Sequence, residues 1–284
     1  MLERALVLLL ALTVAAAGLA AGWWSPAAEA REAAEPLRYA PVREAGSGRT
    51  LLADDPGTGR IVEVIGDLDG AEDVAVVVPG TGQNRGNFRI SDRDAGTVPV
   101  HNGEALYAEM RERSDRVAVV VWLGYRPPQG LNAAAYRLDS AHEGADELAR
   151  LTRDALPGGA HTTFACHSYG AAVCGLAARR PGVADDVVAL GAPGMGVDSA
   201  SEVDARVWAT RAGDDWIRFV PGLRLGGFGL GTDPVSDGFG AAVFTDDRIS
   251  GHEQYYEEGS ASLSALADIA VHGAPARPAA APAS

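Results

Sequence analysis

Long apolar runs alternate along this chain with segments in which apolar residues recur at helical spacing. Four runs contain few polar positions and predict β-strands buried on both faces; they cover residues 73–78, 116–123, 187–190 and 206–210. Helical spacing is found in residues 102–113, 140–156 and 263–270. Strands that alternate with helices pair in parallel through crossover connections. The pattern therefore predicts an α/β fold, a three-layer sandwich with a mostly parallel central sheet flanked by helices.

Two segments depart from this alternation. Residues 49–53 and 60–65 are short β-favouring runs around a turn that contains Pro and Gly, which predicts an antiparallel hairpin. Residues 217–247 are rich in Gly and aromatic residues, and we expect irregular backbone there apart from a short strand at 241–244. A connection of that length is typical of a lid or a binding element.

The N-terminal residues 1–30 carry the pattern of an export segment. After Arg4 the chain is uncharged as far as Ala28, and an Ala-Glu-Ala sequence of the kind that signal peptidase cleaves follows. We expect a cleaved signal peptide; the alternative is an uncleaved membrane anchor, because 18 or more apolar residues can span a bilayer. Both interpretations predict an exported protein, either secreted or anchored at the outer face of the cell membrane.

Composition sets the remaining boundaries. Residues 31–48 form a charged, Pro-containing leader, and the Pro- and Ala-rich residues 274–284 predict a disordered tail. The intervening residues 49–273 form one domain of roughly 230 positions, enough for a sizeable core.

The acidic composition narrows the choice of partners. A formal net charge of −14 and a pI near 4.8 argue against nucleic acid and anionic membrane surfaces. No Cys/His spacing suggests a metal site. We therefore expect no nucleic-acid partner and no metal, with membrane contact only through a retained N-terminal anchor.

A serine in a tight turn marks the candidate chemistry. Residues 161–166 favour a strand, residues 166–170 (Cys-His-Ser-Tyr-Gly) predict a sharp turn around Ser168, and small residues that favour a helix follow. The pattern is close to G-x-S-x-G, the nucleophile elbow, in which a strained turn holds the serine hydroxyl above a parallel sheet. Gly170 keeps the small residue that this turn requires, whereas Cys166 replaces the first glycine. An ordinary strand-to-helix turn that contains a serine is the alternative.

The two cysteines of the chain flank this serine. Gly170 and Cys174 are four residues apart and therefore share one face of the predicted helix. In an elbow that face lies against the strand near Cys166, so we expect a Cys166–Cys174 disulfide in an exported protein. Two buried thiols that act as small apolar side chains are the alternative.

A glycine-rich loop, residues 79–84, follows the buried strand at 73–78. Sites in parallel sheets form at the carboxyl ends of the strands, where this loop is expected. In an elbow enzyme such a loop supplies half of the oxyanion hole. A phosphate-cradling loop is the weaker interpretation, because neither G-x-G-x-x-G nor a P-loop lysine is present.

A serine nucleophile needs a base, which is normally histidine. His252 lies between the last strand-like run and the final helix, where a loop can place an imidazole over the elbow, and it is the preferred base. His101, which we expect in an early loop, stays open as an alternative. The remaining four histidines are expected to have structural roles. We expect His142 and His272 at helix ends, His161 at the start of a strand, and His167 in local packing beside the serine.

The acid that orients the base is expected between the serine and the histidine along the chain. Asp214 and Asp215 follow the strand at 206–210, at its carboxyl end. Asp215 is preferred because an aliphatic residue, Ile217, follows it at the second position; Asp214 stays as the alternative, and either aspartate could instead cap a helix.

Several ordered motifs can now be taken together: residues 77–82, 166–170 and 191–194, the Gly251-His252 pair with Tyr255, and residues 231–240. They resemble the α/β-hydrolase superfamily and, more narrowly, an exported actinobacterial branch labelled as a domain of unknown function. The resemblance spans about residues 60–272. It implies a Ser168–Asp215–His252 triad and an oxyanion hole that uses the N–H groups of Tyr169 and a residue around Thr81.

The residues and the resemblance together predict an exported serine hydrolase that works through an acyl-enzyme, with carboxylic ester hydrolysis as the expected reaction. We expect a small-molecule ester or acyl substrate and no cofactor, because serine-based hydrolysis needs none. An amidase or peptidase is one alternative, because the triad does not choose the leaving group. A binding or envelope protein on a hydrolase scaffold that has lost its chemistry is another, because fold does not fix function.

Overall fold

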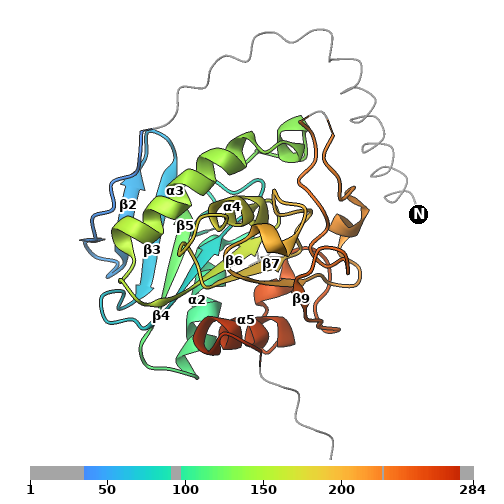
Figure 1. Ribbon diagram of the computed structural model, residues 1–284. Helices are drawn as coiled ribbons and strands as arrows, with labels where there is room; N and C mark the ends of the chain where they lie inside the picture. Colours follow the sequence, from blue (N-terminus) through green and yellow to red (C-terminus); the bar gives the residue numbers. More distant parts are fainter. Residues whose placement is uncertain (1–34, 91–96, 226, 276–284) are drawn as a thin grey trace, which may run out of the picture.

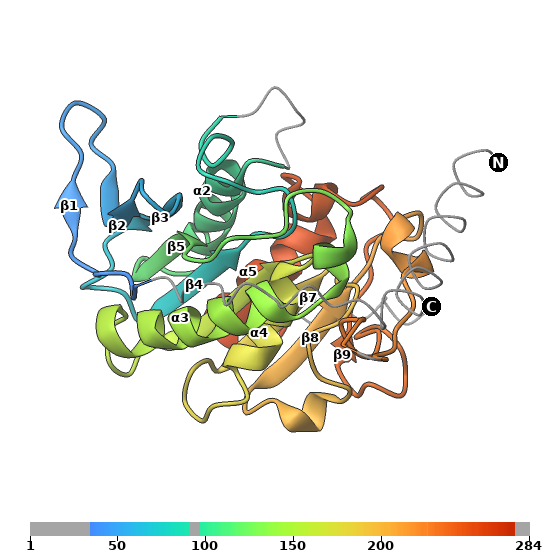
Figure 2. The same cartoon turned by 90° about the horizontal axis from the view of Figure 1, so that it is seen from above.

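A nine-stranded sheet forms the centre of the part of the chain that the structure describes, with helices on both faces (Figure 1, Figure 2). The structure is a computed structural model, and it describes residues 35–90, 97–225 and 227–275. The predicted export segment at 1–30 lies outside the described residues, as do the start of the leader and residues 276–284 of the tail.

The strands follow the order β1-β2-β3-β5-β4-β6-β7-β8-β9 across the sheet. Their bounds are β1 Val42–Arg43, β2 Thr50–Asp55, β3 Arg60–Gly66, β4 Asp73–Val78, β5 Val117–Leu123, β6 His161–His167, β7 Asp186–Leu190, β8 Arg206–Thr210 and β9 Ala242–Val243. From β5 to β9 every neighbouring pair is parallel, and the β1-β2-β3 meander joins β5 antiparallel. The predicted mostly parallel sheet and the predicted hairpin are both confirmed.

Helices α3 and α4 cover one face of the sheet, and α2 and α5 cover the other (Figure 1). The helices span α2 Pro99–Arg111, α3 Asp139–Ala155, α4 Gly170–Ala177 and α5 Ala261–His272, with 3₁₀ turns at η2 Ala133–Tyr136, η3 Ala200–Glu202, η4 Trp216–Phe219 and η5 Gln254–Tyr256. Side chains alternate between the two cores, because successive strand residues point to opposite faces. Val76 of β4 packs under α3 and α4, whereas its neighbour Val77 packs under α2 and α5.

The described part of the predicted leader, residues 35–48, packs on the domain. Leu37 is 4% exposed and belongs to the core under α3. Tyr39 donates a hydrogen bond to the carboxylate of Glu147 on α3, and β1 pairs with β2. The sequence pattern did not predict this packing, because charged residues are interspersed with the apolar ones in residues 35–48.

The expectation of His101 in a loop is wrong. The residue lies exposed in the first turn of α2, which begins at Pro99. Proline is favoured at the first position of a helix because its missing N–H has no partner there in any case.

Within the described residues, no helix combines the length and apolar character needed to cross a membrane. Strands β4, β6 and β8 are parallel members of the sheet, so their carboxyl ends meet at the same edge. The segments that follow them carry Gly80, Ser168 and Asp215.

Candidate active site

Ser168 stands at the apex of a strained turn between β6 and α4. Its φ is 54°, the one positive φ at a residue other than glycine among the described residues. That conformation crowds a Cβ atom and is characteristic of the serine in a nucleophile elbow.

Two glycines let the neighbouring backbone approach this turn. A Cβ on Gly170 would lie 2.5 Å from the carbonyl oxygen of Val78, and one on Gly80 would lie 2.7 Å from the Cβ of Ser168. Any side chain at either position would therefore displace the loop after β4 from the elbow.

The predicted pairing of the cysteines is present: Cys166 and Cys174 form a disulfide. Both residues are fully buried, and the bond joins the carboxyl end of strand β6 to helix α4 beside the serine turn. Cys166 replaces the first glycine of the elbow pattern without opening the turn, because its side chain extends toward α4.

The His252 imidazole bridges Ser168 and Asp215. His252 Nε2 lies 2.9 Å from the Oγ of Ser168, and its Nδ1 lies 2.9 and 3.0 Å from the two carboxylate oxygens of Asp215. A carboxylate can only accept hydrogen bonds, so Nδ1 carries the proton and Nε2 has a lone pair to accept from the serine hydroxyl. Ser168 and Asp215 are buried, at 8% and 0% exposure.

Asp215 is held as an anion by donors on several sides. Burial opposes its ionisation, but hydrogen bonds from His252, the Tyr255 hydroxyl and the Ile217 N–H outweigh burial and lower the pKa of Asp215. Burial and the Asp215 charge raise the pKa of Tyr255, so its hydroxyl stays protonated as a donor. The Tyr255 oxygen also accepts from the N–H of Ala212, which fixes its position.

Asp214, the alternative acid, instead fixes the loop that carries the histidine. Its carboxylate accepts from the Ser250 hydroxyl at 2.6 Å and from the Gly251 N–H at 2.7 Å. Asp215 therefore contacts the imidazole of His252 directly, whereas Asp214 contacts the backbone and side chain of the residues that precede His252.

His167 has a role that sequence reasoning did not find. Its Nε2 donates to the carbonyl oxygen of His252 at 2.7 Å, and the two rings lie 4.7 Å apart between centroids. Burial, and then the charge of His252, lower the pKa of His167 to about 3, which keeps the ring neutral. On its other side the His252 ring meets Trp216, with 5.1 Å between centroids. His167 and Trp216 thus hold the His252 ring in the orientation in which it bonds both Ser168 and Asp215.

The remaining histidines lie elsewhere in the fold. His161 contacts Asp186 at 2.7 Å at the opposite end of β6, the His101 side chain is exposed on α2, and His142 and His272 lie on α3 and at the end of α5. Among the described residues, no group of three or more His, Cys, Asp or Glu side chains is arranged to hold a metal ion.

The expected oxyanion donors flank the serine. Thr81 and Tyr169 line a small pocket together with Ser168. Within the described part of the chain, neither backbone N–H has an acceptor. Both donors are therefore available to a charge that develops beside the serine.

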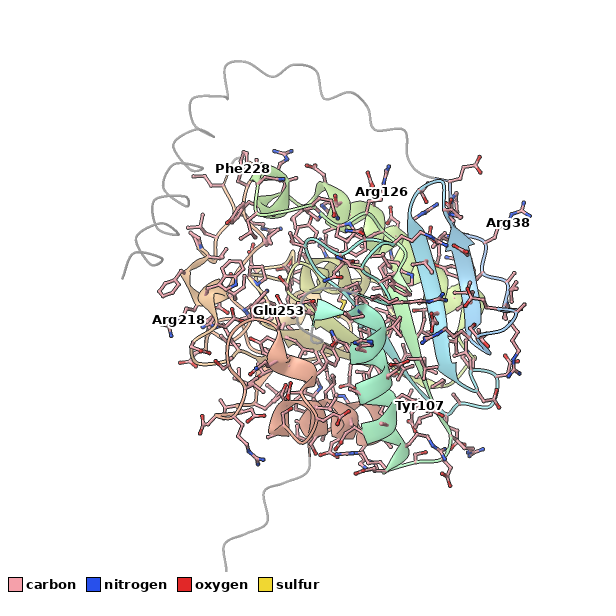
Figure 3. The ribbon with its side chains drawn as sticks, turned by 180° about the vertical axis from the view of Figure 1, so that it is seen from behind. Arg38, Tyr107, Arg126, Arg218, Phe228 and Glu253 are labelled. Carbon is pink, nitrogen blue, oxygen red and sulfur yellow. A yellow bond between two sulfur atoms is a disulfide. The ribbon has the colours of Figure 1, made fainter. Side chains whose placement is uncertain are left out.

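Two cavities meet at Ser168. A cleft of ≈ 410 Å³ is lined largely by amide and hydroxyl side chains and contains His252 and Glu253, the latter labelled in Figure 3. On the other side is a small pocket of ≈ 20 Å³ with a largely apolar lining. Trp216 and Leu131 border both cavities.

Comparison with known proteins adds the family. A family model described as "Alpha/beta hydrolase" matches residues 54–225. The chain belongs to the α/β-hydrolase family. The matched segment covers the β4 loop, the elbow and Asp215, and the resemblance deduced from the sequence is confirmed.

Relatives of this α/β hydrolase occur in mycobacteria. The chain is 31% identical over 258 residues to the uncharacterized protein Rv2079 of Mycobacterium tuberculosis, covering 78% of this chain and 39% of the relative. It is 33% identical over 180 residues to the uncharacterized protein Rv0963c of the same species, covering 59% of this chain and 65% of that protein. The chain thus spans about two fifths of the length of the first of these relatives.

Among solved structures, the α/β hydrolase is similar to esterase PE8, with 16% identity and a TM-score of 0.42 over 66% of this chain and 89% of the other. A CIB-like hydrolase from Thermoplasma acidophilum shows 12% identity and a TM-score of 0.41 over 80% and 98% of the two chains.

Proposed function

We propose that this α/β hydrolase is an exported serine esterase that cleaves carboxylic esters through an acyl-enzyme. The observation that carries the proposal is the hydrogen-bonded row from the strained Ser168 through His252 to the buried Asp215. A serine hydroxyl is a weak nucleophile until a positioned base removes its proton, and this row supplies that base and its orienting acid.

In the proposed reaction, Ser168 Oγ attacks the ester carbonyl carbon while its proton passes to His252 Nε2. The bond to the alcohol oxygen then breaks, and His252 returns the proton to that oxygen, which leaves as the free alcohol. A water molecule next attacks the acyl-enzyme and gives its proton to His252. The carboxylic acid departs when the proton returns to Ser168.

The N–H groups of Thr81 and Tyr169 would hold the negative oxygen of each tetrahedral intermediate. Removing one such donor typically costs about 3 kcal/mol of transition-state stabilisation. The negative charge of Asp215 meanwhile stabilises the imidazolium that forms on His252.

Export rests on two independent features. Residues 1–30 have the pattern of a signal peptide or membrane anchor, and disulfides such as Cys166–Cys174 persist mainly in oxidising compartments. We therefore propose that the enzyme is secreted or is anchored at the outer face of the membrane, with a small ester as its substrate.

Turnover of p-nitrophenyl acetate by the purified protein tests the reaction. We expect hydrolysis by the wild type and a loss of roughly 10⁴-fold or more in kcat for both Ser168→Ala and His252→Ala, because residues that act as one unit fail together. Hydrolysis of p-nitroacetanilide at a comparable rate would assign an amidase instead. A folded wild-type protein that cleaves neither compound would contradict the enzyme assignment and favour a binding protein on a hydrolase scaffold.

A further inference from the structure

We propose that the substrate is an acetyl ester of a neutral, polyhydroxylated alcohol such as a sugar. This inference rests on the proposed esterase function and adds to it the chemical class of both halves of the substrate. It follows from the unlike character of the two cavities that meet at Ser168.

The position of His252 decides which half of the ester enters which cavity. The imidazole must return a proton to the leaving alcohol oxygen, so the alcohol lies on the side where His252 is accessible. His252 lines the large cleft, together with His167 and Trp216. The small pocket instead borders Ser168 through Tyr169, one of the two expected oxyanion donors, while Thr81, the other, lies between the two cavities. The alcohol therefore occupies the cleft and the acyl group occupies the pocket.

The pocket is short and mostly apolar. Its volume of ≈ 20 Å³ gives room for about one water-sized group, which corresponds to the methyl of an acetyl ester. Its apolar walls come from the η2 segment, the loop after β7 and the long loop after β8: Leu131, Ala135, Tyr136, Pro193, Ile217, Val220 and Leu230. A longer acyl chain would have to displace these side chains.

The cleft has about twenty times that volume and a different lining. Amide and hydroxyl side chains predominate, namely Thr81, Gln83, Asn84, Asn87, Thr97 and Gln129. Among its described residues, Glu253 is the one carboxylate and no arginine takes part, so nothing there favours an anionic alcohol such as a sugar phosphate. Neutral donors and acceptors beside the aromatic Trp216 suit the hydroxyls and ring faces of a saccharide.

Hydrogen bonds hold this amide wall in place before any substrate arrives. Gln129 Nε2 donates to the backbone oxygen of Gln83 at 2.9 Å, and Asn84 Nδ2 donates to Gln129 Oε1 at 3.2 Å. Gln83 Nε2 donates a hydrogen bond to the carbonyl oxygen of Thr97 at 2.9 Å. A wall that is already ordered loses little freedom when it binds a ligand.

One acceptor in this wall lacks a partner. Gln83 Oε1 is buried and has no donor among the described residues. A buried acceptor without a donor destabilises the folded protein, but no ligand in the cleft can reach it. Asn84 is an exposed amide of this wall, and its side chain is one that the hydroxyls of a bound alcohol can reach.

The first test compares substrates for the purified wild-type protein. We expect kcat/KM to fall at least about tenfold from p-nitrophenyl acetate to the butyrate ester, because each methylene in a tight pocket counts for roughly that much. We also expect acetate release from acetylated xylo-oligosaccharides to exceed acetate release from acetylcholine. A preference for octanoate, or for acetylcholine over the acetylated saccharide, would overturn this inference and leave the esterase proposal standing. Absence of hydrolysis of every ester would instead reject the esterase proposal itself.

The second test uses variants of the two cavities, each measured as a ratio of specificities. For Asn84→Met we expect kcat/KM for acetylated xylo-oligosaccharide to fall about tenfold further than kcat/KM for p-nitrophenyl acetate. The loss should appear mainly in KM, because the variant lacks a hydrogen-bond partner for the hydroxyl-bearing substrate. For Val220→Ala we expect the ratio of butyrate to acetate hydrolysis to rise about fivefold or more. Glu112→Met, which places the same methionine on an exposed position after α2, is the control and should move neither ratio. Unchanged ratios in both cavity variants would contradict the assignment.

Discussion

Replacing Ser168 by glycine is expected to make the folded protein more stable than replacing it by alanine, although both variants lack the nucleophilic oxygen. The reason is the backbone at this position, where φ is 54°. Glycine adopts this conformation without strain, whereas the Cβ of serine or alanine is crowded by the following carbonyl oxygen.

The magnitude follows from two opposing effects. The left-handed conformation costs a residue with a Cβ roughly 1–2 kcal/mol. Glycine also increases the conformational entropy of the unfolded chain, which lowers the free energy of unfolding by about 0.4–1 kcal/mol. The free energy of unfolding of Ser168→Gly should therefore exceed that of Ser168→Ala by about 1 kcal/mol. The hydrogen bond from Ser168 to His252 is absent from both variants and cancels in the comparison.

Equilibrium unfolding in urea, followed by circular dichroism, measures this difference. Ala105→Gly in α2 is the matched control, and there glycine should lower the free energy of unfolding by about 1 kcal/mol because the backbone is helical. If Ser168→Gly is no more stable than Ser168→Ala, the serine is not held in the left-handed turn and the elbow geometry is wrong.

Three further outcomes are expected. Tyr255→Phe should lower the free energy of unfolding by about 2–3 kcal/mol, since a hydrogen bond to a buried carboxylate is lost; a change below the error of urea titration would contradict this. For the double variant Cys166→Ala, Cys174→Ala we expect the free energy of unfolding to fall by roughly 2.5 kcal/mol, because the unfolded chain is no longer restricted by the closed loop. Reduced wild type should show a similar fall in the same urea titration, and an unchanged stability in both would contradict this. The hydrogen bond that His161 donates to the Asp186 carboxylate raises the pKa of His161. The stability from this pair is therefore complete below about pH 6.5 and declines as pH rises through the folded pKa. His161→Gln should therefore cost more stability at about pH 5.5 than at about pH 9, and an equal cost at both would refute the assignment.

The sequence predicted the central strands well because their burial is encoded locally. Residues 73–78 and 206–210 coincide with β4 and β8, since a run of apolar residues on both faces suits only the middle of a covered sheet. The elbow was recognisable for a similar reason, because its turn needs a small residue at Gly170. The cysteine pair also depended on local spacing within one strand-turn-helix unit.

Two features that the sequence did not predict depend on contacts between distant segments. The hydrogen bond from His167 to the backbone of His252 joins residues 85 positions apart, and no local pattern marks it. The same holds for Leu37, which fills the core under α3 although the nearby Glu35 and Arg38 are charged. His101 was misplaced because Pro99 was not recognised as a helix start. Pro99 is a local signal, whereas the contacts of His167 and Leu37 involve partners that meet only in the folded protein.

The central claim is that Ser168 is a nucleophile activated by His252. Labelling with a fluorophosphonate probe tests it most directly, with the modified residue located by peptide mass spectrometry. The account predicts one adduct, on Ser168, in the wild type and none in Ser168→Ala, with labelling of His252→Ala strongly slowed and that of His101→Ala unchanged. An adduct on another residue, a folded wild type that the probe leaves unmodified, or labelling that is lost in His101→Ala and persists in His252→Ala would contradict the claim.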